Sequence, residues 1–260
     1  MLVNHIEELG DGLFFVCAGE ATRQLRIQAE LLARANAPVL IIGEKGSGKG
    51  TAARLIHKLS GQARNPIRTI DCAEPCSRAL DRALFGDDTS SPGEIASTAP
   101  LFECRTILLR NIVGLTSSCQ AQILNWIVEV ANRRTTNGRD ESQVRMLATC
   151  IPGIETSVAD GSFSAQLYAY FSAFTIYVPP LQSRKDEIPL LLSHFMNQVA
   201  SKYDLPPRLP SSATHFACQS HSWPGNVKEL EDFVKRYLIM GDAAVGFEQL
   251  KSLPVPVTGS

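Results

Sequence analysis

The sequence predicts an α/β protein in which a parallel sheet lies between helices and is followed by a small all-helical lid. Three observations support this fold class. Short apolar runs of the kind found in buried strands alternate with helical segments up to about residue 178. A glycine-rich turn joins one of these strands directly to a helix. Beyond Pro180 only helical patterns occur.

The elements can be placed from periodicity and from turn residues. Strands are expected over residues 39–42, 67–71, 106–109, 144–149 and 174–178. Helices are expected over residues 20–36, 52–57, 77–85 and 117–132, with a polar loop over 86–97 and lid helices over 186–201, 211–219 and 226–240. The predicted organisation is a lead-in segment (1–19), an α/β nucleotide-binding subdomain (20–181), a helical lid (182–253) and a linker (254–260).

Composition excludes several classes of protein. The 260 residues carry a formal net charge of −1, so there is no general attraction to nucleic acid. The seven cysteines are scattered and odd in number, which favours reduced thiols in a cytosolic protein. The apolar runs are too short to span a membrane, and the first residues lack the pattern of a signal peptide. We therefore expect a soluble, cytoplasmic protein with no membrane association.

The glycine-rich turn after the strand Val39–Ile42 has the composition of a phosphate-binding loop. Backbone N–H groups at a strand-to-helix turn converge with the positive end of the helix, and a lysine there adds a mobile charge. The strict pattern has Ser or Thr directly after the lysine to hold magnesium, so the magnesium contact is left open here. ATP or ADP is the expected cofactor, and the candidate binding residues are Gly43, Glu44, Lys45, Gly46, Ser47, Gly48, Lys49, Gly50 and Thr51.

Several motifs together resemble the central AAA+ domain of bacterial enhancer-binding proteins, the activators of sigma-54 RNA polymerase. The likeness spans about residues 17–253. It is carried by the loop 43–49 and by the runs Asp71-Cys72-Ala73, Leu84-Phe85-Gly86, Pro179-Pro180-Leu181 with Arg184 and Ile188-Pro189-Leu190-Leu191, and Trp223-Pro224-Gly225-Asn226-Val227-Lys228-Glu229-Leu230. The resemblance implies an AAA+ P-loop NTPase fold, homo-oligomeric rings and contact with RNA polymerase or a sigma factor. It also implies DNA binding only through a helix-turn-helix module outside this chain.

The chain departs from that family at its catalytic positions. Where the family has Asp-Glu at the end of the Walker B strand, this chain has Arg110 and Asn111. The polymerase-contacting motif Gly-Ala-Phe-Thr-Gly-Ala is not found between Gly86 and Phe102. We therefore expect no remodelling of sigma-54 polymerase.

Further departures affect the residues that would assist hydrolysis. The two arginine-finger positions of the family fall on Ser164 and Tyr170, and the sensor Asn falls on Cys150. The lid's sensor Arg falls on Lys228, which keeps the charge. Because phosphoryl transfer depends on positioning and charge stabilisation, losing these groups together predicts a pseudo-ATPase that binds nucleotide without efficient hydrolysis.

Two interpretations of Arg110 remain open from the sequence. Its guanidinium could contact phosphate oxygens and take over part of the role of magnesium, which would make nucleotide binding metal-independent. Alternatively, Arg110 pairs with Asp71 and fills the pocket. Arg110, Asn111 and Lys228 therefore join the candidate binding residues, and no catalytic or metal-ligating residue is assigned.

Other functions are carried as alternatives. One is a slow ATPase that recruits Asp71, Asp87 or Asp88, and another is a structural oligomerisation domain with an empty pocket. Some relatives of this family sense cyclic di-GMP with a Leu-Phe-Arg-Ser stretch and act without sigma-54. Here Leu13-Phe14 matches but Phe15-Val16 follows, so packing is the favoured role of this segment.

Overall fold

A computed structural model of the chain describes residues 6–10, 12–73, 105–137, 144–204, 206 and 210–240. The expected helix over 77–85 and the expected loop over 86–97 lie outside these residues. The chain divides into two compact units. The sheet unit comprises Leu25–Gly43 and Lys49–Tyr177, and the lid unit comprises Met1–Gln24, Glu44–Gly48 and Val178–Ser260.

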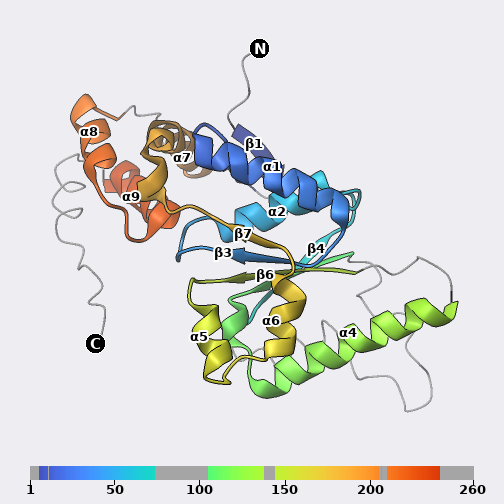
Figure 1. Ribbon diagram of the computed structural model, residues 1–260. Helices are drawn as coiled ribbons and strands as arrows, with labels where there is room; N and C mark the ends of the chain where they lie inside the picture. The colour runs from blue at the N-terminus through green and yellow to red at the C-terminus, as the bar shows by residue number, and fades with distance from the viewer. Residues whose placement is uncertain are drawn as a thin grey trace. The chain divides into compact units, whose positions relative to one another are not determined.

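The sheet unit is built on five parallel strands (Figure 1). Their order is β4 (Ile67–Asp71), β5 (Thr106–Arg110), β6 (Arg145–Cys150), β3 (Val39–Ile42) and β7 (Thr175–Tyr177). Every residue of β3 is buried, as expected for a central strand covered on both faces. The five predicted strands are confirmed, and their parallel order brings all five carboxyl ends to one edge of the sheet.

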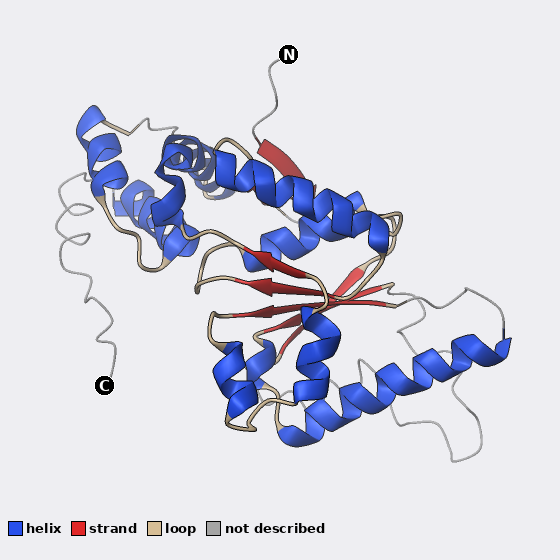
Figure 2. Ribbon diagram, viewed as in Figure 1, coloured by secondary structure: helices blue, strands red, loops and turns tan. Residues whose placement is uncertain are grey.

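Helices cover both faces of this sheet (Figure 2). The helices α1 (Glu20–Ala35) and α2 (Lys49–Leu59) lie on one side, and α4 (Ser117–Asn137), α5 (Ile154–Ala159) and α6 (Ala165–Ser172) lie on the other. A short 3-10 turn, η2 (Ile112–Gly114), follows β5. Helices α5 and α6 were not expected from the sequence, because both are short and begin at turns rather than at strong periodic patterns.

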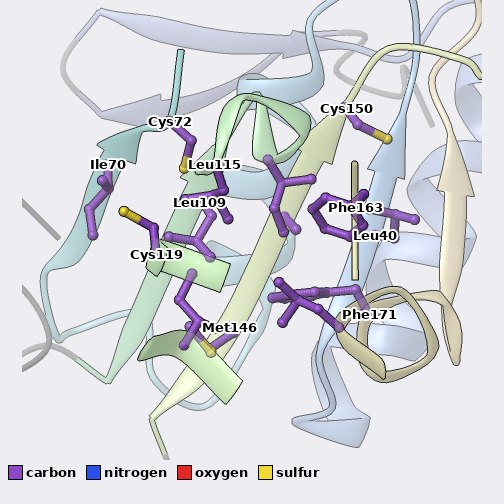
Figure 3. Close-up of a cluster of buried hydrophobic side chains, with 14 of the residues drawn as sticks. Leu40, Ile70, Cys72, Leu109, Leu115, Cys119, Met146, Cys150, Phe163 and Phe171 are labelled. Carbon is purple, nitrogen blue, oxygen red and sulfur yellow. The ribbon is translucent and has the colours of Figure 1, made fainter. Parts of the chain in front are cut away.

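The largest cluster of buried side chains lies between the sheet and the helices α4, α5 and α6 (Figure 3). Alternate residues of β3, β4, β5 and β6 point to this face, as the two-residue period of a strand requires. Five cysteines of the described residues are buried, and three of them belong to this cluster, Cys72, Cys119 and Cys150. The sheet therefore rests on an apolar layer that holds its carboxyl edge in place.

A buried arginine joins β6 to the end of α1. Arg145 donates from Nε to the carbonyl of Ala37 at 3.0 Å and from Nη2 to the carbonyl of Leu32 at 2.8 Å, and Nη1 donates to that of Ala33. These carbonyls lie at the helix end, where backbone acceptors have no partner within the helix. Burial lowers the pKa of Arg145 to about 10, so the guanidinium is still charged at neutral pH.

The lid unit contains a hairpin as well as helices. The strands β1 (Ile6–Gly10) and β2 (Leu13–Val16) pair antiparallel, and they precede η3 (Leu181–Glu187), α7 (Ile188–Lys202), α8 (Ser212–Ser220) and α9 (Asn226–Met240). The predicted lid helices are confirmed, with η3 added before the first of them. The segment expected as a lead-in is therefore largely an ordered hairpin, whose strands are too short to give a periodic signal.

The hairpin belongs to the lid's apolar core. The ring of Phe14 lies 3.7 Å from that of His194 and 5.2 Å from that of Phe195, measured between centroids. Phe15 and Val16 are buried. The remaining core of the lid unit comes from η3, the helices α7 to α9 and the turn between α8 and α9, and includes Leu181, Leu192, Cys218, Trp223, Leu230 and Phe233.

The two compact units group segments that are far apart in the chain, and the expected boundary near residue 181 stays a prediction. Residues up to Gln24 and the loop Glu44–Gly48 group with the lid rather than with the sheet, because their contacts are made with lid residues. In the part of the chain that the structure describes, no helix is both long and apolar enough to cross a bilayer.

Replacing Arg145 by methionine should lower the free energy of unfolding by about 2–4 kcal/mol, because three buried or half-buried carbonyls lose a charged donor. Urea unfolding followed by circular dichroism measures the change. Arg145→Lys is the matched control, since it keeps the charge but cannot reach all three carbonyls, and its loss should be intermediate. Equal stability of Arg145→Met and the unchanged protein would contradict this role.

Candidate functional site

The loop after β3 has the backbone shape of an anion cradle. Gly46 and Gly48 have φ angles of 75° and 100°, a region that residues with a side chain rarely adopt. The N–H of Ser47 donates to the carbonyl of Glu44 at 3.2 Å, which closes a turn within the loop. Helix α2 begins immediately afterwards at Lys49. Successive N–H groups in such a turn, together with a helix N-terminus, form a site for phosphate.

The lysine of the loop and the start of the loop are both fixed to the sheet unit. Lys49 Nζ donates to the carbonyl of Gly43 at 2.8 Å, and the N–H of Gly43 donates to the carbonyl of Cys150 at 3.2 Å. Strand β6 therefore supports the beginning of the loop, and the ammonium group of Lys49 is held beside it.

The residue after this lysine carries no side chain. Gly50 is the second residue of α2, and a Cβ built on it would meet no atom within 4 Å. Space is therefore available for the serine or threonine that the strict P-loop pattern has at this position. Thr51 follows one residue later and is half-buried.

The carboxyl edge of β4 and β5 holds a carboxylate, a guanidinium and an amide. Asn111 Nδ2 donates to Asp71 Oδ1 at 2.9 Å, and Arg110 Nη1 lies 3.8 Å from Asp71 Oδ2. The N–H of Asn111 donates to the hydroxyl of Thr149 at 3.2 Å. Asn111 adopts a left-handed conformation with φ 55°, which asparagine tolerates better than most residues.

These contacts set the charge of the edge. Desolvation opposes ionisation of Asp71, but hydrogen bonds from Asn111 and from the N–H of Ala73, with the nearby Arg110, hold the pKa of the carboxyl below its usual value. The one carboxylate of this trio is thus already bound by protein donors. Of the two interpretations of Arg110, its pairing with Asp71 is observed.

The residues at this edge do not fit a magnesium ion. The positions that the family uses for Asp-Glu hold a cation and an amide, and Mg²⁺ prefers anionic oxygen ligands. Among the described residues no group of three His, Cys, Asp or Glu side chains could hold a metal. No step that uses a metal can be derived from this arrangement.

The position expected for a sensor asparagine is chemically inert. Cys150 ends β6 and is buried, and burial raises the pKa of its thiol to about 11. The thiol is therefore neutral at physiological pH and cannot supply the strong hydrogen bonds of an amide.

The two positions expected for arginine fingers serve the fold of α6. Ser164 is the N-cap of this helix and accepts from the N–H of Leu167 at 3.3 Å, while its own N–H donates to Gln120 Oε1 at 2.7 Å. Tyr170 lies against Phe171 with ring centroids 5.1 Å apart. Neither side chain carries a positive charge.

Other residues of the lid unit donate hydrogen bonds to the carbonyl groups of the loop. Asn226 Nδ2 donates to the carbonyl of Lys45 at 3.1 Å and to Glu44 Oε2 at 2.9 Å. Arg184 Nη2 donates to the carbonyl of Ser47 at 2.7 Å. The backbone N–H of Lys228 donates to the carbonyl of Gly46 at 3.3 Å.

Lys228 reaches the loop only through its backbone in these contacts. Its ammonium pairs with Glu231 at 3.1 Å and with Asp232 at 3.2 Å on the next turn of α9. The structure thus brings Lys228 to the loop, but its charge is engaged along the helix surface.

Sequence reasoning assigned no role to Arg184, Asn226 as a loop contact, or Thr149. Arg184 and Asn226 stand within the motifs that carry the family resemblance, and that position was the available signal. Thr149 lies within the buried strand β6 and gives no signal of its own. The roles of the candidate binding residues in ligand contact stay predictions.

Comparison with known proteins identifies two families along the chain. A model of the sigma-54 interaction domain matches residues 15–177, and a model of the AAA+ ATPase lid domain matches residues 182–254. The transcription regulator NorR of Serratia proteamaculans, named for anaerobic nitric oxide reductase, is 32% identical over 91% of this chain and 48% of its own. The nitrogen assimilation regulator NtrX of Azorhizobium caulinodans is 29% identical over 99% of this chain and 57% of its own.

Solved structures agree with this assignment. NtrX of Brucella abortus superimposes with a TM-score of 0.73 at 30% identity, over 87% of this chain and 51% of that one. Its complexes with ADP and with ATP give TM-scores of 0.73 and 0.74, at 28% and 26% identity, each covering 94% of this chain and 56% of that one. The fold is that of AAA+ P-loop NTPases. The chain spans about half the length of the curated relatives it matches.

Replacing Asn111 by aspartate should destabilise the protein by about 1–2 kcal/mol at pH 7, because the variant sets two carboxylates side by side. Repulsion raises the apparent pKa of the pair in the folded state. The folded state then binds protons at this pair more tightly than the unfolded chain, so the destabilisation relative to the unchanged protein is smallest near pH 4 and grows as pH rises through the folded pKa of the pair. Unfolding measured from pH 4 to 8 tests this.

Asn111→Gly is the control, since it removes the same donor, tolerates the left-handed conformation and adds no charge. Its destabilisation relative to the unchanged protein should vary less with pH than that of Asn111→Asp. Parallel pH profiles for the two variants would show that Asp71 and Asn111 are not coupled.

Proposed function

Because the chain belongs to the sigma-54 interaction domain family, we propose that it is the central regulatory module of a bacterial transcriptional regulator and binds ATP or ADP without efficient hydrolysis. On this proposal the nucleotide sets the position of the lid and the oligomeric state. The module does not remodel sigma-54 polymerase.

The observation that carries the proposal is the trio Asp71, Arg110 and Asn111. A motor of this family needs a carboxylate to hold magnesium and another to activate water. Here the two positions are a cation and an amide, and both are in contact with Asp71. The lack of catalytic groups extends to Ser164, Tyr170 and Cys150. None of these side chains can stabilise developing negative charge as arginine or asparagine would.

Binding without turnover is supported by the loop itself. The glycine conformations, the lysine at the start of α2 and the adjoining helix N-terminus are all present. NtrX of Brucella abortus, which matches most of this chain, has been solved with ADP and with ATP. By analogy, the phosphates of the same nucleotides occupy this loop.

The cation at the edge favours binding that does not require a metal. Arg110 is half exposed, and a contact of 3.8 Å with a partly exposed carboxylate is a weak pair. A polyphosphate carries more charge than one carboxylate, so the guanidinium can turn from Asp71 to the ligand. Neutralisation by Arg110 then replaces part of what magnesium supplies in active relatives.

The rival functions fit less well. A slow ATPase would need Asp71 as a base or a metal ligand, yet its carboxylate accepts hydrogen bonds from Asn111 and Ala73. Asp87 and Asp88 lie outside the described residues. Recognition of cyclic di-GMP by the segment 13–16 is disfavoured, because Phe14 stacks within the lid core and Phe15 and Val16 are buried. The family also implies homo-oligomers and contact with sigma-54 polymerase, and the segment 86–102 lacks the motif for remodelling that polymerase.

Isothermal titration of ATP and ADP should give micromolar dissociation constants both with magnesium and with EDTA, differing by less than about threefold. No phosphate release above buffer is expected in a malachite-green assay at high protein concentration. Binding lost in EDTA would refute the metal-independent site, and no heat in either buffer would leave a structural oligomerisation domain. Turnover that disappears with Asp71→Asn would establish the slow ATPase.

The double variant R110D/N111E restores the acidic pair of the family and provides the matched comparison. Its ATP affinity should become magnesium-dependent, weakening about tenfold or more in EDTA, because two carboxylates repel polyphosphate unless a cation intervenes. The unchanged protein titrated in parallel should show no such dependence. Equal behaviour of the two proteins would mean that the edge of β5 does not face the ligand.

A further inference from the structure

Three consecutive carbonyls of the phosphate loop accept hydrogen bonds from the lid unit. The donors are the side chain of Asn226 to Lys45, the backbone N–H of Lys228 to Gly46 and the side chain of Arg184 to Ser47. All these residues belong to one compact unit of the chain. These three carbonyls therefore all have donors that lie outside the loop.

The direction of these hydrogen bonds bears on ligand binding. A peptide group points its N–H and its C=O in opposite directions, so fixing a run of carbonyls on one side also fixes where the amides point. Anion-binding loops depend on successive amides that converge on one point. By holding the carbonyls, the lid orients the amides that would meet phosphate.

The lid also constrains the loop sterically. A Cβ built on Gly46 would lie 2.1 Å from the carbonyl oxygen of Gly225, which is far inside contact distance. Gly46 must thus lack a side chain both for its φ of 75° and for this approach. The close contact leaves little freedom for the loop to relax while the lid unit is intact.

Arg184 is held for this contact by a buried ion pair. Its Nη1 lies 3.3 Å from Glu187 Oε2, and both side chains are almost fully buried. The other oxygen of Glu187 accepts from the N–H groups of Ala18 and Gly19, at 3.2 Å and 3.0 Å, and from the hydroxyl of Thr22. Arg184 thus has a fixed orientation, set by a carboxylate that is itself fixed.

The network is not arranged for stability alone. Arg184 Nε and the hydroxyl of Ser47 are buried and have no hydrogen-bond partner among the described residues. Each such group costs free energy, and a buried ion pair is often no more stabilising than apolar residues of the same size. What the arginine supplies that an apolar residue could not is a donor to the carbonyl of Ser47.

We infer that Arg184 and Asn226 are positioning residues that set the phosphate-binding conformation of the loop. Neither needs to touch the nucleotide. The inference rests on the proposed function, since it names the groups that make the loop competent to bind phosphates. If loss of one contact leaves a tenth of the molecules with a competent loop, the apparent dissociation constant rises tenfold.

Arg184→Lys and Asn226→Asp are the variants that test this. The first keeps the positive charge beside Glu187 but loses the planar fork that serves Glu187 and Ser47 together. The second keeps the oxygen that accepts from the N–H of Leu181 at 2.7 Å and loses the donor to Lys45 and Glu44. Because it also sets a carboxylate beside that of Glu44, weaker ADP binding of this variant counts for the inference only together with shifted amide resonances in the absence of nucleotide. Ser183→Ala is the control, because Ser183 is exposed in η3 and its hydroxyl donates only to the carbonyl of Pro180 among the described residues.

Dissociation constants for ADP are measured by titration at a temperature where every variant is folded, together with the amide resonances of Gly46 and Gly48 without nucleotide. Arg184→Lys and Asn226→Asp should weaken ADP binding about tenfold and shift both resonances, while Ser183→Ala changes neither. A purely structural role would lower the melting temperature and leave the dissociation constant unchanged.

Two outcomes are distinguishable. If the unchanged protein binds ADP and both variants bind it within twofold, the inference is overturned and the proposed function stands. If the unchanged protein does not bind, the proposed function fails, and the glycine resonances decide separately whether the lid sets the loop. Unshifted resonances in both variants would overturn the inference in that case too.

Discussion

The parallel pairing of β3 with β6 and β7 is the constraint on which the rest of the molecule depends. Because parallel strands end at the same edge, three features reach one side of the sheet: the loop after Ile42, the thiol of Cys150 and the trio around Asp71. The three features come from separate parts of the sequence. The apolar layer under the sheet holds the strands β3 to β6 together, so the chemistry of the edge is determined by which side chains end each strand.

At that edge the chain has a cation and an amide at the positions expected for two carboxylates. A site with two carboxylates attracts a metal and through it a polyphosphate, whereas Arg110 attracts the polyphosphate directly. On the proposed function, this difference retains affinity for anions and removes the groups that would activate water. The hydrogen bond from Asn111 to Asp71 satisfies the carboxylate within the protein. Recognition of a nucleotide and its hydrolysis would then be separable properties of one fold.

Much of the architecture could be predicted from the sequence because its signals are local. Buried strands, the glycine loop and the lid helices are each encoded within a few residues. Helices α5 and α6 and the N-terminal hairpin were missed, since each is short and depends on packing rather than on periodicity. The contacts of Arg145 with α1 join residues more than 100 positions apart, which no local pattern encodes.

The candidate site shows the same limit. The sequence identified the loop and the exchanged residues Arg110 and Asn111, but it left two partners open for Arg110. The pairing with Asp71 depends on strand register, which aligns Asp71 with Arg110 across β4 and β5. The grouping of the loop with the lid was not expected, because the hydrogen bonds from Arg184 and Asn226 cross 137 and 181 positions of sequence.

The contacts of Glu187 have a mechanical consequence. This buried carboxylate clamps Ala18, Gly19 and Thr22 to the lid unit just as the chain enters α1. A pull on the chain before Ala18 is therefore resisted by the packing of the hairpin and by Glu187 before it reaches the remainder of α1. The same carboxylate orients Arg184, which donates to the phosphate loop. Glu187 therefore connects a force on the N-terminal segment with the conformation of that loop.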